Sequence, residues 1–219
     1  MDYSIIPFII LAYLLGSIPT SVWIGKYFHN IDIREYGSGN AGATNTFRVL
    51  GTKAGIIVFV IDLLKGFIAV NLIHLNTAFP GDSELFTTVQ VGYGIAAILG
   101  HVFPVYAEFK GGKGVATLFG AILGISFYPT LIMAGIFFLT LFLTRYVSLS
   151  SLLAGISFPI LIITVYNASA LSLIIFSILI AVLIILTHQK NIERLINNEE
   201  SKADLSKISL KQVKHRQED

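Results

Sequence analysis

The sequence predicts an all-α fold: a polytopic membrane protein with seven transmembrane helices, its N-terminus outside and its C-terminus in the cytoplasm. Of its 219 residues, 54% are hydrophobic and only 13% are charged, and the mean hydropathy is +0.77. Soluble domains carry about 25% charged residues. Apolar runs long enough to cross ~30 Å of hydrocarbon recur along the chain. Composition and run length therefore both indicate a helical membrane protein.

Clusters of lysine and arginine predict the direction of each crossing. Positive residues gather at 26–53, at 110–113, at 145 and from 190 onward, and only Lys65 falls inside an apolar run. The positive-inside rule places each cluster in the cytoplasm. Consecutive clusters must then be joined by an even number of crossings, and the glycine-rich loops that carry these cations lie on the cytoplasmic face.

Most of the expected crossings can be read directly from the apolar runs. Residues 5–23 form the first crossing, and because no cationic segment typical of a cleaved signal precedes it, we expect it to be retained. Two hairpins follow, each with a polar turn, and their expected crossings are residues 54–75 with 85–106, and residues 149–165 with 171–187.

Residues 114–144 do not fit one crossing. A single helix of these 31 residues would extend ~47 Å at about 1.5 Å per residue, and it would leave Arg145 outside. Pro129 favours a helix break near Ser126. We therefore expect two short spans of ~14 residues, which tilted neighbours or a locally thinned bilayer would accommodate.

The chain is expected to have one membrane domain, residues 1–200, and a polar cytoplasmic tail, residues 201–219. No internal repeat is evident, and the segment from Gln189 is expected to begin as a helix. Cysteine is absent, which excludes disulfides and thiol chemistry. The sequence has neither a serine-centred G-x-S-x-G elbow nor a metal-spaced His/Cys set, so we expect no metal and no cofactor.

The first glycine-rich segment combines a freely accessible backbone with polar and cationic side chains. It contains Gly37, Ser38, Gly39, Asn40, Gly42, Thr44 and Asn45, with Arg48 just downstream. Glycines expose backbone N–H groups to an anion, and arginine matches phosphate oxygens. We predict an anion-binding loop here, and a flexible connector is the alternative.

The second glycine-rich segment ends a cytoplasmic loop and opens the next expected crossing. It consists of Lys110, Gly111, Gly112, Lys113 and Gly114. The N–H groups and the dipole of a helix N-terminus attract anions, and Lys113 would add its charge beside them. The alternative is a pair of lysines that anchors the crossing at the interface.

Five polar residues within or beside the apolar runs have two interpretations each. Asp62 and Lys65, spaced i to i+3, predict a structural ion pair first and a place in the wall of the substrate cavity second. His188 and Asn191, also i to i+3, either cap the last crossing or join the two loops in one site. His101 either faces that site or is a packed intramembrane histidine.

Taken together, these segments resemble the bacterial PlsY family of acyl-phosphate–glycerol-3-phosphate acyltransferases, over nearly the whole chain up to about Glu200. The matching motifs are Gly16-Ser17-Ile18-Pro19, the first glycine-rich segment with Arg48, Asp62-Leu63-Leu64-Lys65-Gly66, Gly100-His101 with Pro104, residues 109–117, and His188 with Asn191. The resemblance implies a seven-helix, multi-pass enzyme of the bacterial cytoplasmic (inner) membrane with its site facing the cytoplasm. Residues 201–219 lie beyond the usual pattern.

The resemblance also implies the reaction and the residues that serve it. A fatty acyl group would pass from acyl phosphate to the 1-hydroxyl of sn-glycerol 3-phosphate, giving 1-acyl-sn-glycerol 3-phosphate (lysophosphatidic acid) and phosphate in phospholipid biosynthesis, and residues 1–200 would be the acyltransferase domain. Residues carried over as catalytic are Ser38, Arg48, Lys113, His188 and Asn191. Those expected to bind substrate phosphate are Gly37, Gly39, Asn40, Gly42, Thr44, Asn45, Lys110, Gly111, Gly112 and Gly114, and whether Lys110 shares the work of Lys113 stays open. Glu200 matches a carboxylate with a structural role.

These residue types suit that chemistry independently of the resemblance. An acyl phosphate is already activated, so positioning and electrostatic stabilisation can supply most of the barrier reduction without a covalent acyl-enzyme. The expected partners are the two substrates and membrane lipid, with no nucleic acid. The acyl-chain preference, the oligomeric state and the role of His188 as base or donor stay open. The alternatives are an organic-phosphate transporter or channel, and a noncatalytic scaffold that touches anionic lipid.

Overall fold

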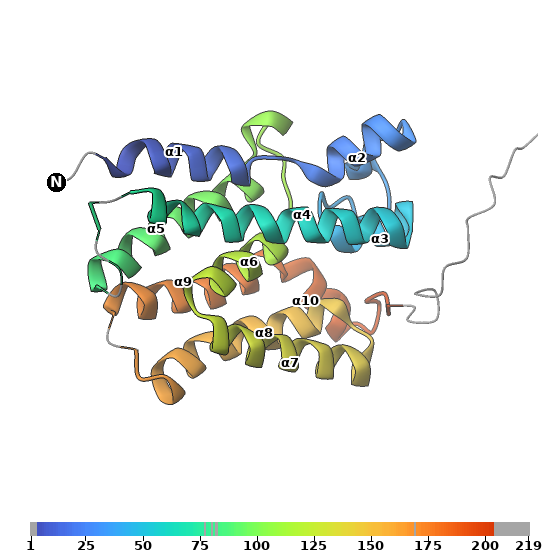
Figure 1. Ribbon diagram of the computed structural model, residues 1–219. Helices are drawn as coiled ribbons and strands as arrows, with labels where there is room; N and C mark the ends of the chain where they lie inside the picture. Colours follow the sequence, from blue (N-terminus) through green and yellow to red (C-terminus); the bar gives the residue numbers. More distant parts are fainter. Residues whose placement is uncertain (1–3, 77, 80, 82, 169, 204–219) are drawn as a thin grey trace, which may run out of the picture.

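The computed structural model describes residues 4–76, 78, 79, 81, 83–168 and 170–203. Within these ranges the chain is helical and contains no strand (Figure 1). The α-helices are α1 (Ile5–Gly16), α2 (Thr20–His29), α3 (Ala43–Leu50), α4 (Thr52–Asn71), α5 (Glu84–Val102), α6 (Val115–Ile125), α7 (Phe127–Thr144), α8 (Val147–Ile160), α9 (Leu171–Thr187) and α10 (Gln189–Ile196). The described residues also form three short 3-10 helices, η1 (Ile33–Glu35), η2 (Leu72–Leu75) and η3 (Val105–Ala107), and one π-helical turn, η4 (Leu161–Val165).

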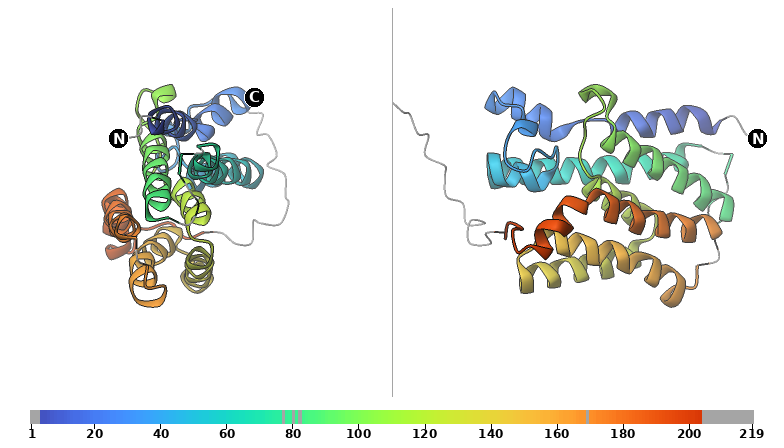
Figure 2. Two further views of the ribbon diagram at one scale, coloured as in Figure 1. Left: turned by 60° about the vertical axis from the view of Figure 1, so that its left-hand side comes forward. Right: turned by 180° about the vertical axis from the view of Figure 1, so that it is seen from behind.

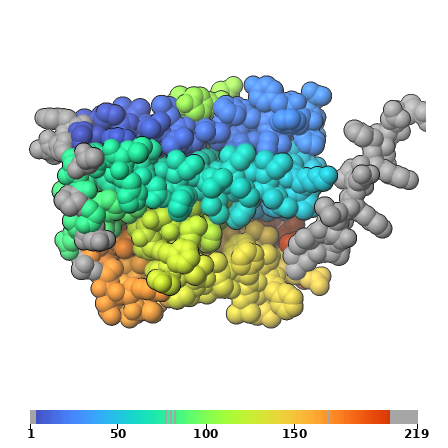
Figure 3. Space-filling view, in the orientation of Figure 1, coloured from blue at the N-terminus to red at the C-terminus, as the bar shows by residue number. Residues whose placement is uncertain are grey.

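The long helices lie side by side and share one direction of elongation. In Figure 1, α1 begins at the left end of this bundle, while α2, α3 and α10 gather at the right end. The reverse view in Figure 2 shows the same grouping from behind. In Figure 3 the surfaces of α1, α4 and α6 adjoin one another across the visible face. Outward apolar side chains such as Phe138 and Phe142 of α7 are largely exposed, as expected for a surface that meets lipid.

Four helical segments of the described chain are long and apolar enough to cross a membrane. They are Thr52–Leu75, Glu84–Ala107, Phe127–Thr144 and Val147–Val165. Two bent pairs, α1 with α2 and α9 with α10, raise this number to six if each pair is one crossing, and α6 is a shorter apolar helix. The all-helical membrane fold is thus confirmed, whereas the count of seven crossings stays a prediction.

The first expected crossing, residues 5–23, is not a continuous helix. α1 ends at Gly16, α2 begins at Thr20, and the two are bent by 42°. Pro19 lies at the break, where it has no N–H for a helical hydrogen bond and disfavours the helical conformation of Ile18. The expected crossing is therefore a bent pair of helices and not one straight helix, and α2 continues beyond its expected end to His29.

The predicted break near Ser126 is confirmed. α6 ends at Ile125 and α7 begins at Phe127, but their lengths of 11 and 18 residues differ from the equal halves that we expected. Pro129 falls in the first turn of α7, where its missing N–H removes no intrahelical hydrogen bond. The break therefore lies at Ser126, three residues before the proline. Of the tail, residues 204–219 lie outside the described residues, and the expected helix from Gln189 is α10.

α4 and α6 approach each other through glycines. A Cβ on Gly66 would lie 1.9 Å from the Thr117 carbonyl oxygen, and a Cβ on Gly120 would lie 1.9 Å from the Leu63 carbonyl oxygen. Within lipid no hydrophobic force draws helices together, so their association depends on the van der Waals packing that such close contacts allow. The contact holds α6, which follows the second glycine-rich segment, firmly against α4.

We predict that Gly120→Ala destabilises the purified protein. The new methyl group would meet a backbone oxygen that cannot rotate away, and overpacking of this kind costs about 1–3 kcal/mol. Gly135→Ala on α7 is the matched control, because a Cβ there has no neighbour within 4 Å. Thermal unfolding in detergent should show a lowered midpoint only for Gly120→Ala; equal midpoints for the two variants would contradict the packing described here.

Candidate active site

Asn45 fixes the shape of the first glycine-rich loop. Its side-chain oxygen accepts a hydrogen bond from the Ser38 N–H (2.9 Å), and its amide nitrogen donates to the carbonyls of Ile33 and Tyr36 (both 3.0 Å). Gly37 has φ of +62°, and a side chain there would collide with Asn45. The buried Asn45 is thus engaged with the backbone of the loop that it supports.

The loop ends where α3 begins. Gly42 precedes the helix in an extended conformation, so Thr44 and Asn45 belong to the first turn of α3 rather than to the loop as expected. Ser38 and Thr44 are exposed, and Arg48 is exposed further along the same helix. The residues predicted for phosphate binding therefore lie partly in a loop, partly on a helix.

Arg34, which precedes this loop and is paired with Asp32, anchors it to the segment between α5 and α6. Arg34 Nη2 lies 2.6 Å from Asp32 Oδ2, and Arg34 Nη1 donates to the Ala107 carbonyl (3.2 Å). The hydrogen bond from Arg34 holds the pKa of Asp32 well below its usual range. In the sequence Arg34 is only one cation of the cluster at 26–53, and the Asp-x-Arg spacing is the one signal of this anchoring role.

The two glycine-rich segments touch at Gly112. The N–H groups of Gly111 and Gly112 donate to the carbonyls of Val102 (3.1 Å) and His101 (3.2 Å), which folds the segment back onto the end of α5. A Cβ on Gly112 would lie 2.4 Å from His101 Nε2 and 2.7 Å from the Ala41 carbonyl oxygen. Ala41 belongs to the first loop, so only glycine permits this contact.

Lys113 links the second segment to the C-terminal helix. Its ammonium donates a hydrogen bond to Asn191 Oδ1 of α10. Asn191 Nδ2 in turn donates to Glu200 (2.7 Å), and Arg194 Nε lies 2.6 Å from the other oxygen of the same carboxylate. Lys113, Asn191 and Glu200 therefore form one connected series of polar contacts.

Burial and neighbouring side chains determine the pKa values of Lys113 and Glu200. Burial lowers the pKa of Lys113 to about 8, although the nearby carboxylate of Glu200 acts in the opposite direction. Burial alone would raise the pKa of Glu200, but hydrogen bonds from Asn191 and Arg194 outweigh it and the pKa is lowered. At neutral pH, Lys113 is thus a cation beside an anion.

His188 lies at the bend between α9 and α10. The two helices are bent by 60°, and the His188 side chain is buried, with Nδ1 2.9 Å from the Ile184 carbonyl oxygen. A carbonyl only accepts, so Nδ1 carries the proton in this contact. The bend brings Asn191 to Lys113 one turn after His188, which joins the third predicted segment to the second.

Lys110 is placed differently from Lys113. Its side chain is 74% exposed and lies 3.8 Å from the carboxylate of Glu108. The structure therefore connects only one of the two lysines of the second segment to α10, and Lys110 stays available to solvent.

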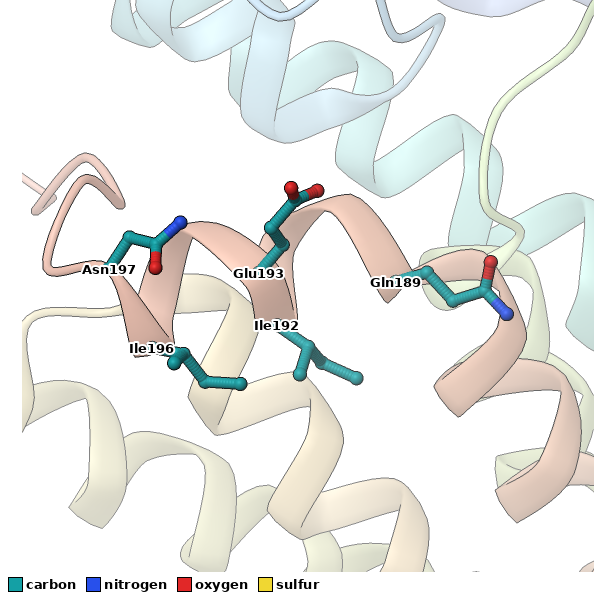
Figure 4. A pocket seen from close by; sticks show the side chains of 5 residues that line it. All are labelled: Gln189, Ile192, Glu193, Ile196 and Asn197. Atoms are coloured by element: carbon teal, nitrogen blue, oxygen red, sulfur yellow. The ribbon is translucent and has the colours of Figure 1, made fainter.

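α10 also carries a shallow groove on its other side. Gln189, Ile192, Glu193, Ile196 and Asn197 line it. Figure 4 shows Ile192 and Ile196 projecting from one side of the helix and Glu193 from the opposite side. Asn191 is not among the lining residues, so the groove is distinct from the contact with Lys113. Within the described ranges, no group of three His, Cys, Asp or Glu residues could hold a metal ion.

Comparison with known proteins identifies relatives along most of the chain. The family model for "Glycerol-3-phosphate acyltransferase" matches residues 6–198. Glycerol-3-phosphate acyltransferase of Staphylococcus carnosus is 47% identical over 200 residues, covering 90% of this chain and 97% of the relative. The enzyme of the same name from Chlorobaculum tepidum is 44% identical over 220 residues, covering 89% and 94%.

Solved structures agree with these relatives. A crystal structure of PlsY, described as an integral membrane glycerol 3-phosphate acyltransferase in its glycerol 3-phosphate form, has a TM-score of 0.84 and 36% identity, and the match covers 95% of this chain and all of that one. The lysophosphatidic acid form of the same protein has a TM-score of 0.79 and 36% identity, with coverage of 94% and 98%.

The pKa of Lys113 generates a prediction about anion binding. Above about pH 8 the ammonium loses its proton, so the affinity for glycerol 3-phosphate should fall as pH rises, whereas the phosphate, with a second pKa near 6, stays a dianion throughout. Calorimetric titration of the purified protein measures this. Lys113→Arg should move the alkaline loss to higher pH because arginine stays protonated. Constant affinity of the unaltered protein up to about pH 10 would contradict the assignment.

Proposed function

The chain belongs to the glycerol-3-phosphate acyltransferase family, and from that premise we propose that it uses acyl phosphate as donor. The fatty acyl group would pass to the 1-hydroxyl of sn-glycerol 3-phosphate, and the products would be 1-acyl-sn-glycerol 3-phosphate and phosphate. The observation that carries this proposal is the link from Lys113 to Asn191 beside the contact between the two glycine-rich segments.

The proposed site offers cations and backbone donors for the phosphates of two substrates. Lys113 contributes a charge beside α10, and Ser38 and Arg48 are exposed, the latter on α3, which gathers with α2 and α10 at one end of the bundle (Figure 1). Glycine N–H groups that are not engaged within the loops can approach phosphate oxygens closely. An acyl chain among the helices would present its carbonyl at this end.

The proposed reaction needs no covalent acyl-enzyme. The 1-hydroxyl oxygen attacks the acyl carbonyl carbon, the bond from that carbon to the phosphate oxygen breaks, and phosphate leaves with the electron pair. The hydroxyl proton passes to the departing phosphate, which becomes basic as it leaves. Lys113 and the backbone donors stabilise the charge that develops, and Asn191 keeps Lys113 in position.

His188 would orient a substrate rather than attack it. Since its Nδ1 donates to the Ile184 carbonyl, the neutral ring presents Nε2 as an acceptor. In this tautomer Nε2 can accept a hydrogen bond from the hydroxyl of glycerol 3-phosphate. That role aligns the nucleophilic oxygen and is compatible with proton transfer to the phosphate.

The proposed location is the bacterial cytoplasmic membrane, with the site on its inner face. The first glycine-rich segment precedes α3, which lies with α2 and α10 at the end of the bundle opposite to the start of α1 (Figure 1), and the positive-inside rule assigns such a cationic end to the cytoplasmic face. Adding α6 to the six crossings obtained from long helices and bent pairs gives the proposed seven.

We predict that Lys113→Ala and Arg48→Ala each reduce kcat/KM for phosphate release by about 10²-fold or more, which is typical for loss of one donor that stabilises developing charge. The assay measures phosphate released from acyl phosphate plus glycerol 3-phosphate by purified protein in detergent. Lys53→Ala, an exposed cation on α4, is the control and should keep the unaltered rate.

Near-normal kinetics in a folded Lys113→Ala, Arg48→Ala double variant would reject the assigned roles. The same assay separates the competing functions. A transporter would move glycerol 3-phosphate across vesicles without releasing phosphate, and a lipid-binding scaffold would do neither.

A further inference from the structure

A buried polar cluster lies at the break between α1 and α2. Asp62 Oδ1 accepts a hydrogen bond from Thr20 Oγ1 (3.0 Å) and lies 2.8 Å from Lys65 Nζ. Lys65 Nζ also donates to the Ile18 carbonyl (2.9 Å), which lies within the break. The charged side chains are 97% and 96% buried, so the cluster satisfies a break that would be costly within lipid.

His101 connects this cluster to the second glycine-rich segment. On one side of the ring, Nδ1 lies 3.1 Å from Thr117 Oγ1 and 3.8 Å from Asp62 Oδ1. On the other side, Nε2 lies against Gly112, where a Cβ would come within 2.4 Å. His101 is also buried, and its carbonyl accepts the Gly112 N–H.

We propose that His101 is a positioning residue: its ring lies between the Asp62–Lys65 pair and Gly112, holds Gly112 in place and thereby orients Lys113. Lys113 follows Gly112 directly, so a displacement of Gly112 moves the Cα from which the Lys113 side chain extends toward Asn191. Misplacement of a catalytic group by ~1 Å can cost about 10²-fold in rate. The inference rests on the proposed function only in assigning Lys113 to a substrate phosphate.

A histidine that merely fills space would be replaceable by any side chain of similar volume. The structure indicates otherwise, because the two ring nitrogens have different neighbours. Nδ1 faces Thr117 and Asp62, while Nε2 faces the loop. Substitutions that imitate one nitrogen at a time therefore separate positioning from packing.

The test compares His101→Asn with His101→Gln. The asparagine amide reaches the place of Nδ1 and leaves the place beside Gly112 empty, whereas the glutamine amide extends to the place of Nε2. We expect His101→Asn to lower kcat/KM for acyl transfer about 10²-fold with an unchanged thermal midpoint, and His101→Gln to restore most of that loss. Gln90→Met is the matched control on α5, because Gln90 is buried and donates to the Gly124 carbonyl, away from the loops.

Hydrogen exchange of the Gly111 and Gly112 amides supplies a readout that needs no acyl donor. His101→Asn should speed exchange at these amides and leave the rest of α5 unchanged, whereas Gln90→Met should not affect them. If the unaltered protein fails to use acyl phosphate, the proposed donor is wrong. The exchange rates of the His101→Asn and Gln90→Met variants still decide the role of His101 in that case. Equal exchange in all variants, or equal activity of the Asn and Gln variants, would overturn the proposal.

Should His101→Asn fail to fold, Thr117→Val provides the second variant. It removes the partner of Nδ1 and keeps the ring, so the ring loses its fixed orientation. We expect about a tenfold loss of kcat/KM, corresponding to one neutral hydrogen bond, with faster exchange at Gly112. Unaltered kinetics and exchange in a folded Thr117→Val protein would equally overturn the proposal.

Discussion

The contact at Gly112 joins the parts of the candidate site. A side chain at this residue would collide with both the His101 ring and the Ala41 carbonyl, so the backbone of the second segment rests directly on the first loop. Lys113 comes next in the chain and reaches Asn191 of α10. Segments that lie far apart in the sequence thus meet through one position without a side chain, and the orientation of the cation depends on that contact.

The membrane explains why so much of the support is polar and buried. A broken crossing leaves backbone groups without helical partners, and lipid offers none. Lys65 satisfies the Ile18 carbonyl at the break, and Asp62 compensates its charge. Asp62 also lies near His101. The ion pair that stabilises the break between α1 and α2 is therefore next to the histidine that contacts the second glycine-rich segment.

Much of the fold could be predicted because apolar runs and cation clusters are local signals. The helix break at Ser126 was expected from the length of the apolar run, the position of Arg145 and Pro129, and the ion pair of Asp62 with Lys65 from their i to i+3 spacing; both are confirmed. The break at Pro19 was missed because its apolar flanks read as one continuous crossing. The contacts of Arg34 with Ala107 and of His101 with Gly112 depend on how the intervening segments fold, and no periodicity encodes them. The roles of Ser38 and Arg48 came from resemblance and stay predictions.

The most direct test of the account is an experimental structure of this protein with glycerol 3-phosphate bound. The account predicts a phosphate oxygen within hydrogen-bonding distance, about 3 Å, of Lys113 Nζ, with further contacts to backbone N–H groups of the glycine-rich segments. A phosphate bound away from Lys113, for example along the groove of α10, would contradict it.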